Sequence, residues 1–223
     1  MRYFYFLRHC TTEFNEAQIV QGACDSPLSE YGRKQADESG NMFSKINFDY
    51  AFTGNQERHI ETARRILRKN IYGSQTQSFC HPGLNEHDLG FFDKGSEENL
   101  YNNASRLYEE KYNLKKGSIS TKELLMKHKI SMIELSSIFH EMDSTNKTES
   151  VNQVKERCLA ALKEICHKTD NNSRILIVSS GGTLSILLNA LTGQEEDGYI
   201  IHHGHCVVIR ENCSHFEKIG FYD

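Results

Sequence analysis

The hydrophobic positions of the chain fall into short continuous runs. Residues 1–7 (MRYFYFL) are apolar at nearly every position, a pattern typical of a parallel strand that is covered on both faces. The same reasoning, with turn residues as boundaries, predicts further strands. They are expected at 48–54, 76–84 and 174–180, with a closing pair at 206–212 and 215–221.

Helical patterns lie between these runs. In residues 149–168 one helical face carries Val151, Val154, Cys158, Leu162 and Ile165. Further helices are predicted at 29–46, 55–70 and 181–193, the last closed by Gly193. Strand and helix therefore alternate, and this alternation predicts a layered α/β fold with a largely parallel sheet.

Residues 91–148 break the alternation. The segment is rich in charge, contains two or three amphipathic helical patches and has no apolar strand. We interpret it as a helical cap inserted into a single domain that spans residues 1–223, because structureless loops of this length are uncommon within a domain.

Composition narrows the function. The 223 residues are 38% hydrophobic and carry a formal net charge of −4, and no basic block interleaved with aromatic residues indicates a nucleic-acid surface. The seven cysteines form no CxxC pair and no metal-ligand spacing, which is typical of free thiols in a reducing compartment. No apolar stretch is long enough to span a membrane. These features predict a soluble, cytoplasmic protein that binds neither nucleic acid nor membrane.

Polar residues follow the predicted strands, where ligands bind in open parallel sheets. Arg8 and His9 follow the first strand, and Ser180 and Gly181 follow 174–180 at the start of a helix, where backbone N–H groups favour an anion. Arg58 begins another helix, and Glu86 follows the strand predicted at 76–84. Arginines to bind oxygens, a histidine to attack phosphorus and an acid to protonate a leaving group together favour a phosphoryl group as ligand.

At these residues the sequence resembles the histidine phosphatase superfamily, the phosphoglycerate mutase-like family. Six blocks follow the family's order and span almost the whole chain outside the insertion. They are RHCTTEFN (8–15), GACDSPLSEYGRKQA (22–36), QERHIETA (56–63), LNEHDLG (84–90), ESVNQVKERC (149–158) and VSSGGT (178–183).

The resemblance implies a three-layer α/β/α sandwich and catalysis through phosphohistidine, without a metal or diffusible cofactor. His9 is then the nucleophile, Glu86 the proton donor, and the remaining site residues bind the phosphoryl oxygens. That binding set is Arg8, Asn15, Arg58, Ser180 and Gly181.

Four positions depart from the family's pattern. Cys10 replaces a glycine, Gly54 a frequent serine, His59 a small residue and Ser180 the second histidine, which donates a hydrogen bond to the phosphoryl group in the family. Losing a charge-assisted hydrogen bond costs roughly 1.5–3 kcal/mol, so activity is expected to be about ten- to a few hundredfold weaker. Ser180→His is then expected to restore it.

The residues leave alternatives open. His87 and His205 are candidate substitutes for the missing imidazole; if either one acts, restoration at Ser180 gains little. The run IIHHGHC (200–206) fits a polar loop better than a metal site, because no acidic or cysteine partner stands at a defined metal-ligand spacing. We favour a phosphatase acting on a small phosphorylated metabolite. A non-catalytic phospho-ligand-binding protein is the alternative, and a phosphoglycerate mutase is less favoured.

Overall fold

A six-stranded sheet lies at the centre of the computed structural model, which describes residues 1–127, 129–193, 201–212 and 215–222. The strand order is β3–β2–β4–β1–β5–β6. The strands are β1 (Arg2–Arg8), β2 (Tyr50–Thr53), β3 (Gln77–Cys80), β4 (Arg174–Ser179), β5 (Cys206–Asn212) and β6 (His215–Tyr222). Strands β1 to β4 are parallel, β5 is antiparallel to β1, and β6 is antiparallel to β5. The predicted, mostly parallel sheet is confirmed.

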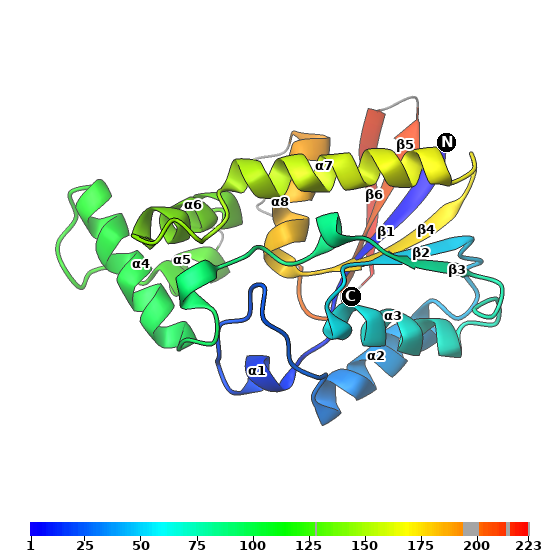
Figure 1. Cartoon of the computed structure of the whole chain (residues 1–223), viewed down its shortest axis with the longest axis horizontal. Coiled ribbons are helices and arrows are strands. Elements are labelled where there is room, and N and C mark those ends of the chain that lie inside the picture. Colours follow the sequence, from blue (N-terminus) through cyan, green and yellow to red (C-terminus); the bar gives the residue numbers. More distant parts are fainter. Residues whose placement is uncertain (128, 194–200, 213–214, 223) are drawn as a thin grey trace.

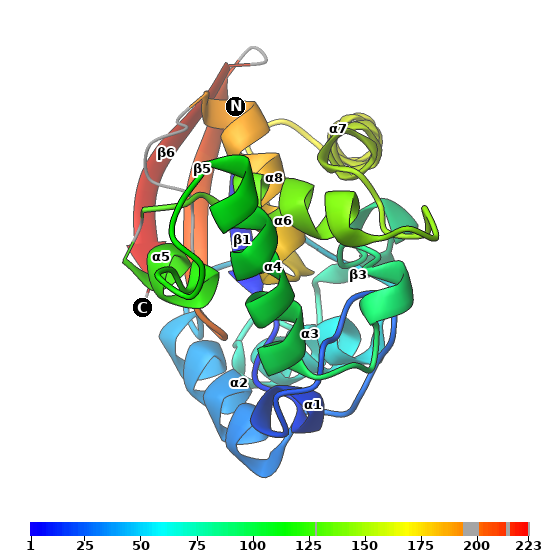
Figure 2. The same cartoon turned by 90° about the vertical axis from the view of Figure 1, so that its left-hand side faces the viewer.

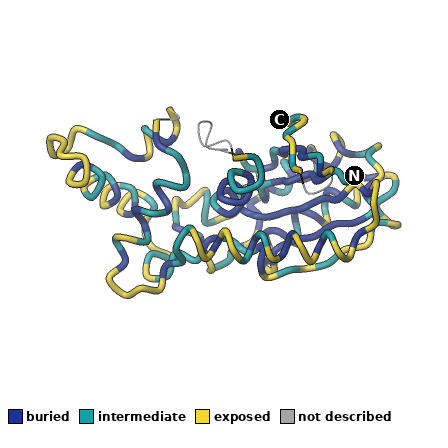
Figure 3. The backbone as a smooth tube through the Cα atoms, turned by 90° about the horizontal axis from the view of Figure 1, so that it is seen from above, coloured by how far each residue is buried: buried dark blue, intermediate teal, exposed yellow. Residues whose placement is uncertain are grey.

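Strand β1 shows why its sequence is apolar at consecutive positions. Phe4 and Phe6 belong to the hydrophobic cluster on one face of the sheet, whereas Tyr5 and Leu7 belong to the cluster on the other. Successive side chains of a strand point to opposite faces. A strand in the middle layer therefore needs apolar residues at both parities, and the strands at the centre of the sheet are buried along most of their length (Figure 3).

Helices cover both faces of the sheet and complete the predicted three-layer α/β/α sandwich (Figure 1). Helices α2 (Glu30–Met42) and α3 (Glu57–Lys69) cover one face, and α7 (Val151–Lys168) and α8 (Gly181–Thr192) cover the other. Serine side chains cap the amino ends of α2 and α7, and α8 ends at Gly193 in the left-handed conformation at φ 65°.

The described residues of 91–148 are helical apart from their connections, as predicted. They form most of the short 3-10 turn η2 (Gly90–Phe92) and the helices α4 (Glu97–Lys111), α5 (Thr121–Met126) and α6 (Met132–Met142). These helices lie together at one end of the sandwich (Figure 2). They share a hydrophobic cluster of their own, which also takes in Val20 from the amino-terminal part of the chain.

Two local predictions differ from the structure. The strand predicted at 76–84 ends at Cys80, because Pro82 begins the 3-10 turn η1 (Pro82–Leu84) and proline has no N–H for a ladder. The short helix α1 (Glu13–Glu16) was not predicted. A capping box between Thr12 and Asn15 forms it rather than an apolar face, and none of its residues is buried.

The remaining expectations concern disulfides and membranes. The six cysteines within the described residues are all free thiols. Across the same residues, no helix combines the length and apolarity that crossing a bilayer requires.

The centre of β4 tests the contribution of the middle layer to stability. Ile177 is fully buried there, whereas Ile219 on β6 is 46% exposed. We expect Ile177→Ala to lower the free energy of unfolding by roughly 2–5 kcal/mol, through lost burial and a residual cavity. The matched surface change Ile219→Ala should stay within about 0.5 kcal/mol. Urea unfolding of both variants measures the difference, and equal losses would contradict this packing.

Candidate active site

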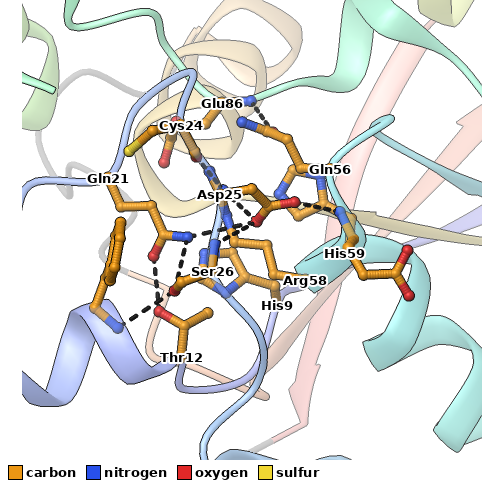
Figure 4. A network of polar contacts seen from close by, with 12 residues as sticks. His9, Thr12, Gln21, Cys24, Asp25, Ser26, Gln56, Arg58, His59 and Glu86 are labelled. Atoms are coloured by element: carbon orange, nitrogen blue, oxygen red, sulfur yellow. Dashed lines mark hydrogen bonds and ion pairs between the residues drawn. The ribbon is translucent and has the colours of Figure 1, made fainter. Parts of the chain in front are cut away.

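Five predicted site residues gather at the carboxyl edge of the parallel strands. Arg8 ends β1 and His9 follows it, Ser180 follows β4 directly, Arg58 lies in the first turn of α3, and Glu86 comes shortly after η1. The close-up in Figure 4 shows His9, Arg58 and Glu86 within one network of polar contacts. Residues far apart in sequence therefore form one site.

His9 is held in one tautomer. Its side chain is 3% exposed, and Nδ1 lies 2.8 Å from the carbonyl oxygen of Cys10. A carbonyl can only accept, so Nδ1 carries the hydrogen and Nε2 keeps its lone pair. Burial above all, and then the charge of Arg58, hold the pKa of His9 well below its usual range. A neutral imidazole with a free Nε2 is the form that can attack phosphorus.

Arg8 lies against the start of α8. A Cβ atom on Gly181 would stand 3.1 Å from the guanidinium of Arg8, so the glycine allows this close approach. One terminal nitrogen of Arg8 donates to the carbonyl of Ile201 at 3.0 Å, and its Nε is buried without a partner. The guanidinium and the amino end of α8 together present hydrogen-bond donors suited to an anion.

Arg58 is fully buried and anchored by a loop. Its terminal nitrogens donate to the carbonyl oxygens of Gly22 and Cys24 at 2.9 and 2.7 Å, and to Asp25 at 2.9 Å. The Nε atom is buried and unpartnered. Asp93 in turn accepts from the backbone N–H groups of Gly22 and Cys24. The insertion therefore helps to position Arg58 through this loop.

Glu86 is fixed from two sides. Its Oε1 accepts from the backbone and hydroxyl of Thr183 at 3.1 and 3.0 Å and from the backbone of His87 at 2.8 Å. Its backbone N–H donates to Gln56, whose amide also donates to the carbonyl of Gly22. Gln56 thus connects Glu86 with the loop that holds Arg58. Sequence analysis missed this role, although Gln56 opens the QERHIETA block.

Asn15 borders the same cavity as Arg8 and Glu86. Its side chain accepts from the backbone and the hydroxyl of Thr12 through Oδ1, and its backbone N–H donates to the Thr12 hydroxyl. The amide hydrogens on Nδ2 take no part in this cap.

An imidazole contacts Ser180, but it belongs to neither predicted substitute. His59 Nε2 lies 2.6 Å from Ser180 Oγ, and both residues are fully buried. His87 instead donates from Nε2 to the carbonyl of Glu149, and the ring of His205 lies 5.5 Å from that of His202. In the sequence, His59 stood out because it departs from the family's pattern directly after Arg58. That departure did not show which way its ring points.

Two imidazoles lie beside that of His9. The ring centroids of His59 and His203 lie 5.4 and 5.3 Å from that of His9. Burial first, with Arg8 next, lowers the pKa of His203 to about 2, and burial followed by Arg58 holds the pKa of His59 well below its usual range. His203 was expected to be part of a polar loop, yet its ring lies beside that of His9. In the described part of the chain, no group of three or more His, Cys, Asp or Glu residues is placed to hold a metal.

A cavity of about 230 Å³ adjoins the site; His203 borders it, whereas His9 and His59 are not among its lining residues. Its inner wall includes Arg8, Glu86, Gly181 and His203. Its outer wall is mostly apolar and comes largely from the insertion and the loop after α1. The residues of that wall are Ile19, Val20, Leu89, Glu97, Leu100, Tyr101, Met132, Ser136 and Phe139.

Comparisons with known proteins identify the family of the chain. The model of the histidine phosphatase superfamily (branch 1) matches residues 4–122 and 117–215. Fructose-2,6-bisphosphatase TIGAR B of Danio rerio is 34% identical over 100 residues, which cover 44% of this chain but only 39% of that protein. Phosphoglycerate mutase-like protein 4 of Arabidopsis thaliana is 25% identical over 182 residues, covering 81% and 67%. The phosphoglycerate mutase from Bacillus anthracis str. Sterne shares the fold, with a TM-score of 0.83 at 23% identity over 97% of this chain and 91% of that one.

The buried neutral imidazoles predict a pH-dependent stability. His9, His59 and His203 have depressed pKa values when folded, so the unfolded chain binds protons near pH 6.5 that the folded chain does not. Stability is then complete above about pH 6.5 and is lost as the pH falls, by up to about 1.4 kcal/mol per pH unit for each ring. Urea unfolding at about pH 7.5, 6.5 and 5.5 measures this slope.

A matched pair of variants tests whether the buried histidines cause the pH dependence of the free energy of unfolding. His59→Gln removes one buried titrating ring and should flatten the dependence by about one proton. His167→Gln removes an exposed histidine on α7 and should leave the slope as it is. A wild-type stability that does not change between these pH values would contradict the buried, neutral rings.

Proposed function

Because the chain belongs to the histidine phosphatase superfamily, we propose that it hydrolyses the phosphate monoester of a small metabolite through a phosphohistidine on His9. The observation that carries this proposal is the state of His9: Nδ1 is occupied by the Cys10 carbonyl, and the ring is neutral. A residue that only bound phosphate would gain from a charged imidazole. A nucleophile needs the uncharged one.

The reaction has two half-reactions. In the first, Nε2 of His9 attacks phosphorus in line, the ester P–O bond breaks, and Glu86 protonates the leaving oxygen. In the second, water attacks the phosphohistidine and gives a proton to Glu86 as the P–N bond breaks. Inorganic phosphate leaves, and His9 and Glu86 return to their starting states.

The surrounding donors hold the phosphoryl oxygens. Arg8 and Arg58 each have a buried Nε atom without a partner, and Gly181 and Ser180 begin α8 beside them. Asn15 adds an amide from the opposite wall. Donors fixed by the fold stabilise the charge that develops in the transition state without having to reorganise, which is the largest contribution in many enzymes. No metal or diffusible cofactor takes part in this scheme.

Variants of the nucleophile and the acid test the proposal. His9→Ala should lower kcat by about a thousandfold or more and abolish the phosphoenzyme. Glu86→Gln should cost about 100- to 10,000-fold with an alkyl phosphate and much less with p-nitrophenyl phosphate, whose leaving group needs no proton. Phosphate release and the intact mass of alkali-quenched protein give the two readouts.

A surface histidine serves as the control. His167→Ala on α7 should behave as wild type. Phosphate binding without turnover in wild type, unaffected by His9→Ala, would favour the alternative, a non-catalytic phospho-ligand-binding protein.

The outer wall of the cavity supports a preference among substrates. No lysine borders the described part of the cavity, and Arg8 in the phosphoryl site is its only arginine. Lys122, beside two residues of the outer wall, is paired with Glu97 at 3.4 Å and lies over the ring of Tyr101. A second phosphate would meet the Glu97 carboxylate there. We therefore propose a monophosphate whose organic part is small and largely apolar, in contrast to the bisphosphate in the name of the Danio rerio relative.

Matched substrates test this preference. We expect kcat/KM to fall from an aryl monophosphate to a hexose monophosphate and by about tenfold or more again to a hexose bisphosphate, because like charges repel in a partly dry cavity. Met132→Lys would add a cation to the outer wall and should reduce the difference in kcat/KM between the hexose monophosphate and the hexose bisphosphate. Met126→Lys, at a 56% exposed site on α5 that does not line the cavity, should leave this difference unchanged. A bisphosphate that is the best substrate of the wild type would contradict the proposal.

A further inference from the structure

Three of the four departures from the family's pattern meet at one ring. The imidazole of His59 extends from α3 toward the start of α8, where Nε2 contacts Ser180 Oγ at 2.6 Å. On the other side of the ring, a Cβ atom on Gly54 would stand 2.3 Å from Nδ1, closer than real Cβ atoms approach. A histidine at position 59 therefore fits because position 54 has no side chain and position 180 has a short one.

The ring is close to the nucleophile and to the phosphoryl site. Its centroid lies 5.4 Å from that of His9 (Figure 4). Ser180 directly precedes Gly181, against which the Arg8 guanidinium rests. The pair formed by His59 and Ser180 thus lies beside both the attacking group and the arginine.

The surroundings of the ring select its tautomer. Nδ1 is buried and has no hydrogen-bond partner among the residues that the structure describes. With the hydrogen on Nδ1, the protein would bury an N–H group that has no acceptor, and such groups are rare. With the hydrogen on Nε2, the ring donates to Ser180 Oγ. The hydroxyl is then oriented by a donor and directs its own hydrogen elsewhere.

We propose that His59, acting through Ser180, replaces the second histidine of the site. His59 donates to Ser180 Oγ, and the Ser180 hydroxyl donates to a phosphoryl oxygen as charge develops there during transfer to His9. Ser180 is the group that touches the substrate, and His59 is a positioning residue. The inference rests on the proposed phosphatase function and adds to it a route for the missing hydrogen bond.

This route reverses an expectation drawn from the sequence. If position 180 were simply missing its imidazole, Ser180→His would raise activity. The structure instead predicts that Ser180→His alone lowers it, because the new ring would collide with His59. An increase in kcat for the single variant would overturn the inference.

Two variants of similar size separate hydrogen bonding from packing. His59→Leu fills much of the space of the ring but cannot donate, whereas His59→Gln can still donate to Ser180 Oγ. With p-nitrophenyl phosphate, we expect His59→Leu to lower kcat by about 10- to 150-fold with a smaller effect on KM. His59→Gln should retain more than about a tenth of the wild-type kcat. Equal losses in the two variants would show that His59 only packs, and would overturn the inference.

A double-variant cycle tests whether His59 acts through Ser180. Ser180→Ala should cost about as much as His59→Leu, and His59→Leu/Ser180→Ala should be no worse than the poorer single variant, because one chain of hydrogen bonds is lost only once. Independent, multiplicative losses would overturn the relay. Circular dichroism confirms folding, and Ser180→Ala reports on the same bond if His59→Leu does not fold.

His9→Ala keeps the two proposals distinguishable. Loss of activity in His9→Ala, with wild-type activity in both His59→Leu and Ser180→Ala, leaves the phosphatase proposal standing and rejects the relay. Activity that persists in His9→Ala rejects the phosphatase mechanism itself, whatever the His59 series shows.

Discussion

The fully buried guanidinium of Arg58 is the constraint on which the site depends. A charge removed from water must be compensated by the protein, and breaking such compensation costs several kcal/mol. Here the compensation comes from Asp25 and from the carbonyls of Gly22 and Cys24. The loop that carries them is held by Asp93 at the start of the insertion and by Gln56 beside Glu86. One buried cation thus links the position of Glu86 to that of the cap.

The same burial determines the protonation of the histidines. Arginines crowd His9, His59 and His203 within a space that excludes water, so all three rings are neutral at physiological pH. Neutral rings act as lone-pair donors or as hydrogen-bond donors, depending on which nitrogen the surroundings occupy. The Cys10 carbonyl leaves the lone pair of His9 Nε2 unused, whereas Ser180 is the hydrogen-bond partner of the His59 ring among the described residues. Chemically identical side chains can therefore carry different tasks.

The inner and outer walls of the cavity come from different parts of the fold. Its inner wall is built by strand ends and helix starts of the sandwich, which are rigid because they belong to the buried sheet. Its outer wall is built largely by α4 and α6, which pack on one another and on Val20 in a separate hydrophobic cluster. Substitutions in that cluster can change the shape offered to the organic part of a substrate without moving His9. Function in this architecture is set by loops and insertions that a constant scaffold supports.

Much of this protein is readable from its sequence. Apolar runs such as residues 1–7 and amphipathic periods such as 149–168 report burial on two faces or one, so they determine the elements and their layering. The order of the blocks around Arg8, His9, Arg58 and Glu86 indicates the site, because strand ends on one sheet edge converge. The shortened strand at Cys80 and the helix capped by Thr12 show the limits of pattern alone, since local hydrogen bonds and Pro82 decide them.

Only the tertiary structure decided which side chain contacts Ser180. Read along the chain, Gly54, His59 and Ser180 are three unrelated departures, and the contact that unites two of them joins residues 121 positions apart. Periodicity describes which face of an element is buried, but it carries no information on whether one side chain fills the volume that another leaves. That outcome depends on the distance between packed backbones, which exists only once β2, α3 and α8 have been brought together by the sheet.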